Sequence, residues 1–345
     1  MNTGLARSLA AAGIILMSGA GAQSVSAQEI TLKFSHYIPP NHGIQVDLIE
    51  PWAKALSEKT KGKVKVEIFA VNSAFGNAAR QADQVKAGVI DIAFGLRGIP
   101  RGRFERTSVI ELPFMVKDAG AGSRVLWELY KDGTIKADYE GFKVLGLMTH
   151  HGGLIHTVNK PVRTPDDLKG MRLRTPSDAV SAMLEAQGAS PVGLPPAQIY
   201  ENLQKSVIDG VVTTWDLVAA IKLNELLKYH SDGKFYTAAF YIVMDQKRFD
   251  ELPADVRAAI DELSGDALVA KFGGWWDKWD AAGLADSKAK GHEIITLNDA
   301  ERAKWREQLK PMVEKYLTEL EGKGIKDARQ IYAKMNELVT KYDKK

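Results

Sequence analysis

Segments with strand periodicity alternate with segments of helical periodicity in the first part of the chain, and this order restricts the fold more than any other feature. ITLKFSHY at 30–37 alternates apolar and polar residues, as a half-buried strand does. KVKVEIFA at 63–70 and VIDIAFGL at 89–96 are further strand candidates. Helical patterns at 45–62 and 77–88 lie between them, and each ends in a glycine that is suited to close a helix. This order predicts an α/β fold with a parallel sheet covered by helices.

A second series of strand and helix patterns follows. MRLRTP at 171–176 has the character of a strand, and SDAVSAMLEAQG at 177–188 that of a helix with Ser177 as its N-cap. KFYTAAFYIVMD at 234–245 is long enough to cross between two structural units. The last third is mostly helical. A chain of 345 residues suggests two domains, which we expect to be joined by several short crossings that suit a hinge.

The first 27 residues have the layout of a secretory signal peptide. Arg7 supplies a positive charge, an apolar run extends over 9–17, and Val25-Ser26-Ala27 is a suitable cleavage site. A transmembrane anchor needs about 20 apolar residues, and this run is shorter and rich in Gly and Ala. We therefore expect a mature chain that begins near Gln28 and is exported to the periplasm as a soluble protein.

Charge and residue types argue against several classes of function. The 46 Lys and Arg and the 43 Asp and Glu are well mixed, without a basic block, so we expect no nucleic-acid partner. The chain has no cysteine, which excludes disulfides, thiolate catalysis and Cys-ligated zinc. It also lacks a nucleophile elbow, a zinc-protease helix motif and a phosphate-binding loop. We expect neither an enzyme nor a cofactor.

Two arginines two residues apart, Arg172 and Arg174, share one face of the strand at 171–176. Ligands of open α/β sheets bind beyond the carboxyl ends of the strands, and Arg174 is nearer that end. Its guanidinium can hold a carboxylate with two parallel bonds, and the helix that starts at Ser177 turns its backbone N–H groups to the same space. Surface ion pairing explains two such arginines equally well from the residues alone.

Three histidines, His150, His151 and His156, lie close together in the sequence and offer a metal site as an alternative. On a strand, however, neighbouring side chains point to opposite faces. We expect no metal and interpret these rings as hydrogen-bonding groups in a cleft or at the surface. The competing hypothesis is a secreted, histidine-dependent metalloenzyme.

The string KPVRTPDDLKGMRLRTP at 160–176 resembles the motif of solute-binding proteins of tripartite ATP-independent periplasmic (TRAP) transporters, of the C4-dicarboxylate-binding type. LKFSHYIPPNHG at 32–43, VIDIAFG followed by VIELPFM, and LQKSVIDGVVT at 203–213 support the resemblance, in the order and spacing of that family. The resemblance covers essentially the whole mature chain.

The resemblance implies a two-domain periplasmic-binding-protein (Venus flytrap) fold with several hinge crossings and a long C-terminal helix. Such a protein closes on an organic acid and delivers it to the small and large membrane subunits of the transporter; a ligand-binding sensor subunit is the alternative. We expect a monomer. The corresponding ranges are 28–150 with about 240–278 for domain I, about 151–239 with 279–330 for domain II, and 331–345 for the C-terminal helix.

The resemblance also implies that Arg174 forms the salt bridge to the ligand carboxylate. Many family members carry a further Arg upstream of the residue that is Asn159 here, and that position is Leu154 in this chain. The common Asn after the Asp-Gly turn is missing as well. We therefore expect a monocarboxylate with an apolar, aromatic, hydroxy or oxo body rather than a dicarboxylate or sialic acid.

Further candidates surround this anchor. Arg97 could replace the missing cation or lie on the surface, Phe94 could stack on a ligand or fill the core, and Asp216 could accept a hydrogen bond from a ligand hydroxyl. Trp215 could form an apolar wall or belong to the core. We expect the tryptophans at 275, 276 and 279 to form a packing seam along a helix. The full set of candidate binding residues is Arg174, Trp215, His151, His156, Tyr37, His36, Phe94, Arg97, Ser177, Thr214 and Asp216.

Overall fold

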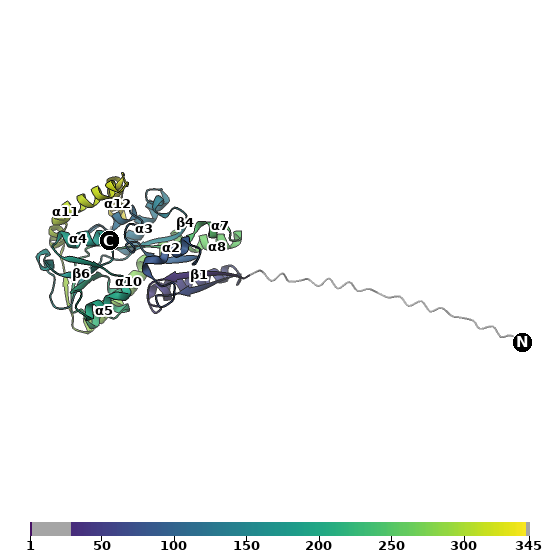
Figure 1. The fold of residues 1–345 in the computed structure, drawn as a ribbon, viewed down its shortest axis with the longest axis horizontal. Coiled ribbons are helices and arrows are strands. Elements are labelled where there is room, and N and C mark those ends of the chain that lie inside the picture. The colour runs from purple at the N-terminus through teal and green to yellow at the C-terminus, as the bar shows by residue number, and fades with distance from the viewer. Residues whose placement is uncertain (2–28, 343–345) are drawn as a thin grey trace.

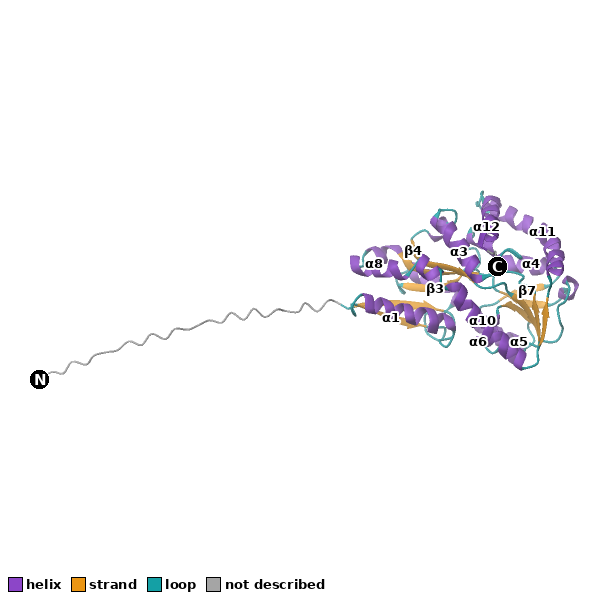
Figure 2. Cartoon of the chain, turned by 180° about the vertical axis from the view of Figure 1, so that it is seen from behind, coloured by secondary structure: helices purple, strands orange, loops and turns teal. Residues whose placement is uncertain are grey.

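The computed structural model of the chain describes Met1 and residues 29–342. The predicted signal peptide and its cleavage site therefore lie outside the described residues, apart from Met1. The strands form two sheets, and helices cover them (Figure 1). Seen from behind and coloured by secondary structure, helix α10 lies between the two sheets (Figure 2). The predicted α/β fold is confirmed.

The first sheet contains five strands in the order β2-β1-β3-β10-β4. Strand β1 pairs in parallel with both β2 and β3, as the sequence predicted. Strand β10 comes from much later in the chain and runs antiparallel between β3 and β4, so the sheet as a whole is mixed. The bounds are β1 Ile30–His36, β2 Val64–Phe69, β3 Ile92–Leu96, β4 Phe142–Thr149 and β10 Ala239–Asp245.

The second sheet has six short strands in the order β11-β9-β5-β8-β6-β7. Strand β6 runs parallel to β7 and β8, whereas β5 is antiparallel to β8 and β9. The carboxyl ends of β6 and β8 therefore lie at the same edge of the sheet. The bounds are β5 Leu154–Thr157, β6 Arg172–Thr175, β7 Ser190–Gly193, β8 Gly210–Thr213, β9 Tyr229–Asp232 and β11 Glu293–Thr296.

The chain crosses between the sheets at three places. It passes from β4 to β5 through residues 150–153, returns from β9 to β10 through 233–238, and crosses again along α10. Helix α10 packs on both α3 and α6, which belong to different halves of the molecule. It approaches α6 closely at Gly283, where a Cβ atom would lie 2.0 Å from the backbone oxygen of Trp215. Several crossings, as predicted, thus connect the two sheets.

Helices cover the sheets and form the C-terminal part of the chain. None of the helices within the described ranges is both long and apolar enough to cross a bilayer. The bounds are α1 Glu50–Lys59, α2 Gln81–Lys86, α3 Ala119–Lys131, α4 Asp178–Ala186, α5 Ile199–Gln204, α6 Trp215–Ala220, α7 Gln246–Asp250, α8 Ala254–Leu263, α9 Asp266–Val269, α10 Phe272–Ala289, α11 Asp299–Gly322 and α12 Ala328–Tyr342.

The long C-terminal helix is present, and it packs on the body of the protein. Helix α12 contacts α3 and α11, with Ile331 and Met335 fully buried (Figure 1). An amphipathic helix gains most of its stability from burying such an apolar face. The last helix therefore braces the first half of the molecule against α11.

Candidate functional site

A cavity lies between the two sheets, and residues of both sheets and of the crossing segments form its wall. It contains about 460 Å³ of empty space, part of which is open to solvent. We call it the central cavity. It is lined by Tyr37, Ile38, His42, Ile44, Phe94, Leu96, His150, Arg174, Pro176, Pro196, Thr213, Thr214, Asp216, Leu217, Tyr236, Ala238, Phe240 and Trp276.

Arg174 is the only lysine or arginine among the described residues that line the central cavity, and it is 1% exposed. Its Nε donates to the backbone oxygen of Leu194 at 2.9 Å, and Nη1 donates to that of Val212 at 3.3 Å. Its Nη2 is buried and has no hydrogen-bond partner within residues 29–342. Burial lowers the pKa of Arg174 to about 10, so the guanidinium stays charged at neutral pH. The cavity wall therefore contains a buried cation with a free donor.

Two tyrosine hydroxyls lie in the field of this cation. Tyr37 follows β1, and Tyr236 belongs to the crossing between β9 and β10. Burial raises the pKa of both hydroxyls, and the charge of Arg174 opposes that rise in each case. Both hydroxyls stay protonated and can donate a hydrogen bond. An anion that binds Arg174 could therefore accept hydrogen bonds from the hydroxyls of Tyr37 and Tyr236, which belong to different parts of the chain.

Aromatic rings form a continuous wall of the cavity. Tyr37 stacks on Phe94, with ring centroids 5.7 Å apart, and Phe94 stacks on Phe240 at 5.6 Å. Phe240 in turn contacts Trp276 at 6.0 Å. Rings arranged in this way favour a flat apolar guest over a branched polar one. Trp276 also contacts Trp279, with ring centroids 5.3 Å apart, so it belongs both to the expected packing seam and to the cavity wall.

Asp216 is the anionic residue of the cavity, and His42 is its partner. His42 Nε2 lies 2.8 Å from Asp216 Oδ2, and both side chains are at most 5% exposed. His42 comes from the loop after β1, and Asp216 from the first turn of α6, so this contact joins the two halves of the molecule. The sequence analysis missed His42, although it lies in the string at 32–43 that carried the family resemblance.

His150 is one of the three histidines that we expected to form hydrogen bonds in a cleft or at the surface, and it lies in the cavity wall. Its Nε2 accepts a hydrogen bond from the backbone N–H of Ala238 at 2.9 Å, and its Nδ1 faces the backbone oxygen of His151. Burial lowers its pKa to about 4, so the ring is neutral. His150 therefore fixes the crossing strand against β4 and adds no charge to the cavity.

Of the predicted binding residues, the structure brings five together in the central cavity: Tyr37, Phe94, Arg174, Thr214 and Asp216. The other six do not line it. They are His36, Arg97, His151, His156, Ser177 and Trp215.

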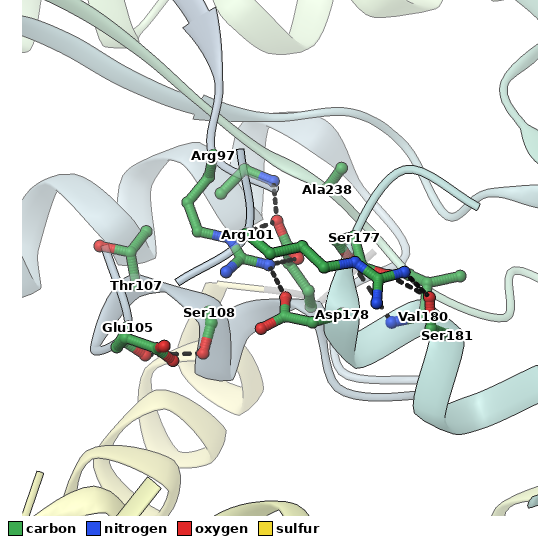
Figure 3. A network of polar contacts seen from close by, with 12 residues as sticks. Arg97, Arg101, Glu105, Thr107, Ser108, Ser177, Asp178, Val180, Ser181 and Ala238 are labelled. Atoms are coloured by element: carbon green, nitrogen blue, oxygen red, sulfur yellow. Dashed lines mark hydrogen bonds and ion pairs between the residues drawn. The ribbon is translucent and has the colours of Figure 1, made fainter. Parts of the chain in front are cut away.

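Arg97 neither faces the ligand space nor lies on the surface, and both expectations for it are corrected. It is 1% exposed and pairs with Glu111 and Asp178. Figure 3 shows the contact with Asp178. Its Nε donates to Glu111 Oε1 at 3.1 Å, and its Nη2 donates to Asp178 Oδ1 at 2.7 Å. Two carboxylates balance the charge of this guanidinium, whose Nη1 has no hydrogen-bond partner among the described residues, and Arg97 does not line the central cavity. Arg97 is therefore not placed to replace a missing ligand cation.

Trp215 and His156 lie behind the cavity wall. Trp215 packs against His156 and His230, with ring centroids 5.1 and 4.8 Å away. His156 Nδ1 lies 2.7 Å from His230 Nδ1, and His230 Nε2 lies 3.0 Å from His292 Nδ1. Burial lowers the pKa of His156 well below its ordinary value. These rings form a neutral hydrogen-bonded row in the core.

His36, His151 and Ser177 have local partners. His36 Nε2 contacts Gln45 Oε1 at 3.0 Å. Ser177 caps α4, as predicted, through its hydroxyl oxygen and the N–H of Val180. His151 Nδ1 accepts from the N–H of Ala119 at 3.0 Å.

A metal could be held by one set of side chains. Within the described part of the chain, His151 forms with Asp118 and Asp277 the one group of three His, Asp or Glu whose donor atoms lie within 4.8 Å of one another. The side chains of Asp118 and Asp277 are 50% and 74% exposed, and Asp118 also caps α3. Helix capping and the bond to Ala119 already explain these contacts.

Comparison with known proteins places these features in a family. The model of "Bacterial extracellular solute-binding protein, family 7" matches residues 34–319. A TRAP solute-binding protein from a marine metagenome, described as specific for aromatic acid ligands and bound to 3-hydroxybenzoate, is 31% identical, with a TM-score of 0.88, over 92% of this chain and 100% of that chain. A TRAP solute-binding protein from Rhodoferax ferrireducens with copurified benzoate is 32% identical, with a TM-score of 0.86, over 91% of this chain and 99% of that chain.

A curated relative gives a further comparison. The outer membrane transporter protein TsaT of Comamonas testosteroni is 27% identical over 87% of this chain and 89% of that protein. The likeness to the solved structures over nearly the whole described chain confirms the predicted two-domain binding-protein fold and the family resemblance.

Proposed function

The chain belongs to family 7 of the bacterial extracellular solute-binding proteins, the family of the TRAP solute-binding proteins, and we propose that it binds an aromatic monocarboxylic acid in the central cavity. Arg174 carries this proposal. A buried guanidinium with an unpaired Nη2 is costly unless an anion satisfies it, and a ligand carboxylate is an anion of suitable geometry.

The surroundings of Arg174 favour an aromatic body. A carboxylate at Nη2 can also accept hydrogen bonds from the hydroxyls of Tyr37 and Tyr236. The rest of the ligand then meets the ring wall of Phe94, Phe240 and Trp276. Two solved relatives hold 3-hydroxybenzoate and benzoate, and both ligands combine one carboxylate with one ring.

The charges favour one carboxylate rather than two. Arg174 is the one fixed cation among the described lining residues, and His150 is neutral. Asp216 repels a second carboxylate. Leu154, which occupies the place of the family's further arginine, is 2% exposed in β5 and adds no charge. A dicarboxylate would therefore leave one of its charges buried without a partner.

The cellular role follows from the family. In this proposal the signal peptide at 1–27 exports the chain to the periplasm, and the protein works as a monomer. The two units at 28–150 with about 240–278, and about 151–239 with 279–330, close around the acid. The closed form then delivers it to the small and large membrane subunits of a TRAP transporter, without chemical change.

Calorimetric titration with benzoate and succinate tests the proposed ligand class. We expect benzoate to bind at micromolar or lower concentration and succinate not to bind. A ligand at one hundred times its Kd adds about 2.7 kcal/mol to the free energy of unfolding, so a thermal-shift assay provides an independent readout. Tight binding of succinate would contradict the proposal. A failure of both benzoate and succinate to bind would contradict it as well.

A further inference from the structure

Asp216 gives the central cavity a second charged group, opposite in sign to Arg174. Its Oδ2 faces His42 Nε2 at 2.8 Å, and its Oδ1 accepts a hydrogen bond from the hydroxyl of Thr214. The backbone N–H of Leu217 is a further donor to this carboxylate. A carboxylate offers about four acceptor sites, so about one site remains free on a residue that lines the cavity.

The partners of Asp216 are neutral donors. The backbone N–H of Ile44 donates to His42 Nδ1 at 3.0 Å, so Nδ1 holds a lone pair and the ring proton is on Nε2. His42 therefore donates its one proton to Asp216 and carries no charge in this arrangement. No cation neutralises Asp216 within hydrogen-bond distance among the described residues.

A second carboxyl group, that of Asp280, lies beside Asp216. Asp280 Oδ1 accepts a hydrogen bond from the backbone N–H of Asp216 at 2.9 Å. Burial, together with the charge of Asp216, raises the pKa of Asp280 well above its ordinary value. For Asp216, burial also disfavours the charged form, whereas the hydrogen bonds from His42 and Thr214 favour it. Of the two acids, Asp216 therefore holds the negative charge more readily.

Asp216 and Arg174 act on the same small space. Burial raises the pKa of the Tyr37 hydroxyl, the charge of Arg174 opposes the rise, and that of Asp216 adds to it. The same three influences act on Tyr236. Both hydroxyls therefore lie where the fields of the cation and the anion overlap. Because Arg174 and Asp216 both line the central cavity, a ligand that reaches Arg174 with its carboxylate shares this space with Asp216.

We propose that Asp216 accepts a hydrogen bond from a hydroxyl group of the ligand, so that the preferred ligands are hydroxylated aromatic monocarboxylic acids. This inference rests on the proposed function. A ligand ring without a hydrogen-bond donor would cover the remaining acceptor site of Asp216 and leave this buried carboxylate unsatisfied. A hydroxyl on the ring would instead donate a hydrogen bond to that site. A methoxy group has nearly the same shape but offers an acceptor only, and it would be repelled.

The experiment is calorimetric titration of the wild type with benzoate, 3- and 4-hydroxybenzoate, 3- and 4-methoxybenzoate and 3-aminobenzoate. We expect at least one hydroxy acid to bind at least ten-fold more tightly than benzoate, with its methoxy counterpart weaker than benzoate. Benzoate that binds as tightly as both hydroxy acids would overturn the inference while leaving the proposed function intact. Tighter binding of 3-aminobenzoate than of the hydroxy acids would overturn the assignment of a hydroxyl.

Substitutions of Asp216 and Asp280 show which of the two carboxyl groups is responsible for the preference for a hydroxylated ligand. Asp216→Asn should bring the affinity ratio of the hydroxy acid to benzoate towards one. Asp280→Asn is the matched control, because Asp280 lies outside the central cavity, and it should leave the ratio at the wild-type value. An unchanged ratio in Asp216→Asn would overturn the inference, and so would a loss of the ratio in Asp280→Asn alone. If the wild type binds none of the acids, the proposed function itself fails.

Discussion

Arg174 is held in position by two backbone oxygens and offers its third nitrogen to the cavity. Its bonds to Leu194 and Val212 orient the guanidinium without neutralising it. A binding site gains affinity when such a group is oriented before the ligand arrives, because the cost of ordering it is already met by the fold. In the proposed function, Arg174 is thus oriented for ligand binding, and its buried, unpaired charge lowers the stability of the ligand-free protein.

Arg174→Met should weaken ligand binding without lowering the stability of the ligand-free protein. It removes the charge but keeps an unbranched apolar side chain, so we expect the affinity for benzoate to fall by about 2–5 kcal/mol, or roughly 30-fold to several thousand-fold. The melting temperature of the ligand-free protein should not fall below the wild-type value, because an unpaired buried cation has been removed.

Arg174→Lys is the matched control for this prediction. It keeps the charge but loses the planar fork, so we expect an affinity between those of Arg174→Met and the wild type. Calorimetry gives the affinities and differential scanning fluorimetry the melting temperatures. Wild-type affinity in Arg174→Met would refute the anchor assignment.

At the scale of elements, one ion-pair cluster ties the end of β3 to the start of α4. Arg97 follows β3, Asp178 is the first residue of α4, and Glu111 lies in a short helix of the first half. Glu111 Oε1 also accepts a hydrogen bond from the N–H of Ala239, where β10 begins. Arg97 and Glu111 are essentially inaccessible to solvent, whereas the side chain of Asp178 is 18% exposed. Glu111 is therefore the fully buried partner of Arg97, and Asp178 is its partly exposed partner.

Glu111→Gln should cost more stability than Asp178→Asn. Removing one partner of a fully buried pair costs about 3–5 kcal/mol, because the remaining charge loses its compensation. Loss of the partly exposed Asp178 leaves Arg97 with Glu111, and we expect a cost of about 1–2 kcal/mol. Urea unfolding of both variants measures these differences, and equal costs would contradict the assigned roles.

The sequence predicts local features of this region well and its long-range partners poorly. The cap of α4 by Ser177 is confirmed, because it depends on residues three positions apart. Arg97 meets Asp178 across 81 positions. No periodicity or spacing reports such a contact, since it depends on how two sheets are packed.

The same limit applies to the cavity wall. The order of strands and helices, and the strand-end position of Arg174, were sufficient to predict a ligand anchor near the second sheet. Tyr236 and Phe240 were missed because the crossing strand has the apolar pattern of an ordinary core strand. Gly273 and Gly274 both lie inside α10, and the chain turns earlier, at Gly265. The packing of α10 between both halves overrides the low helix propensity of glycine.

At the scale of the whole molecule, neutral histidines are buried in both halves. Burial lowers the pKa of His36 and of His150 to about 4, and that of His230 to about 3. An unfolded chain binds protons at these rings below about pH 6.5, whereas the folded chain does not. Stability is therefore fully present above that pH and is lost as the pH falls towards the folded pKa values.

We expect each of these rings to lower the free energy of unfolding by about 2 kcal/mol between pH 7.5 and pH 5. Urea unfolding at the two pH values measures the loss. His230→Gln removes one titrating ring, so it should reduce the loss of unfolding free energy between the two pH values by about 2 kcal/mol. Stability that is constant or rises on acidification would contradict the assignment of neutral buried histidines.

The most direct test of the account is a crystal structure of the protein with benzoate or a hydroxybenzoate bound. The account predicts that one carboxylate oxygen of the acid lies within about 3 Å of Arg174 Nη2, a hydrogen-bond distance, with the ring against Phe94 and Phe240. A carboxylate bound away from Arg174, or a ligand outside the central cavity, would contradict it.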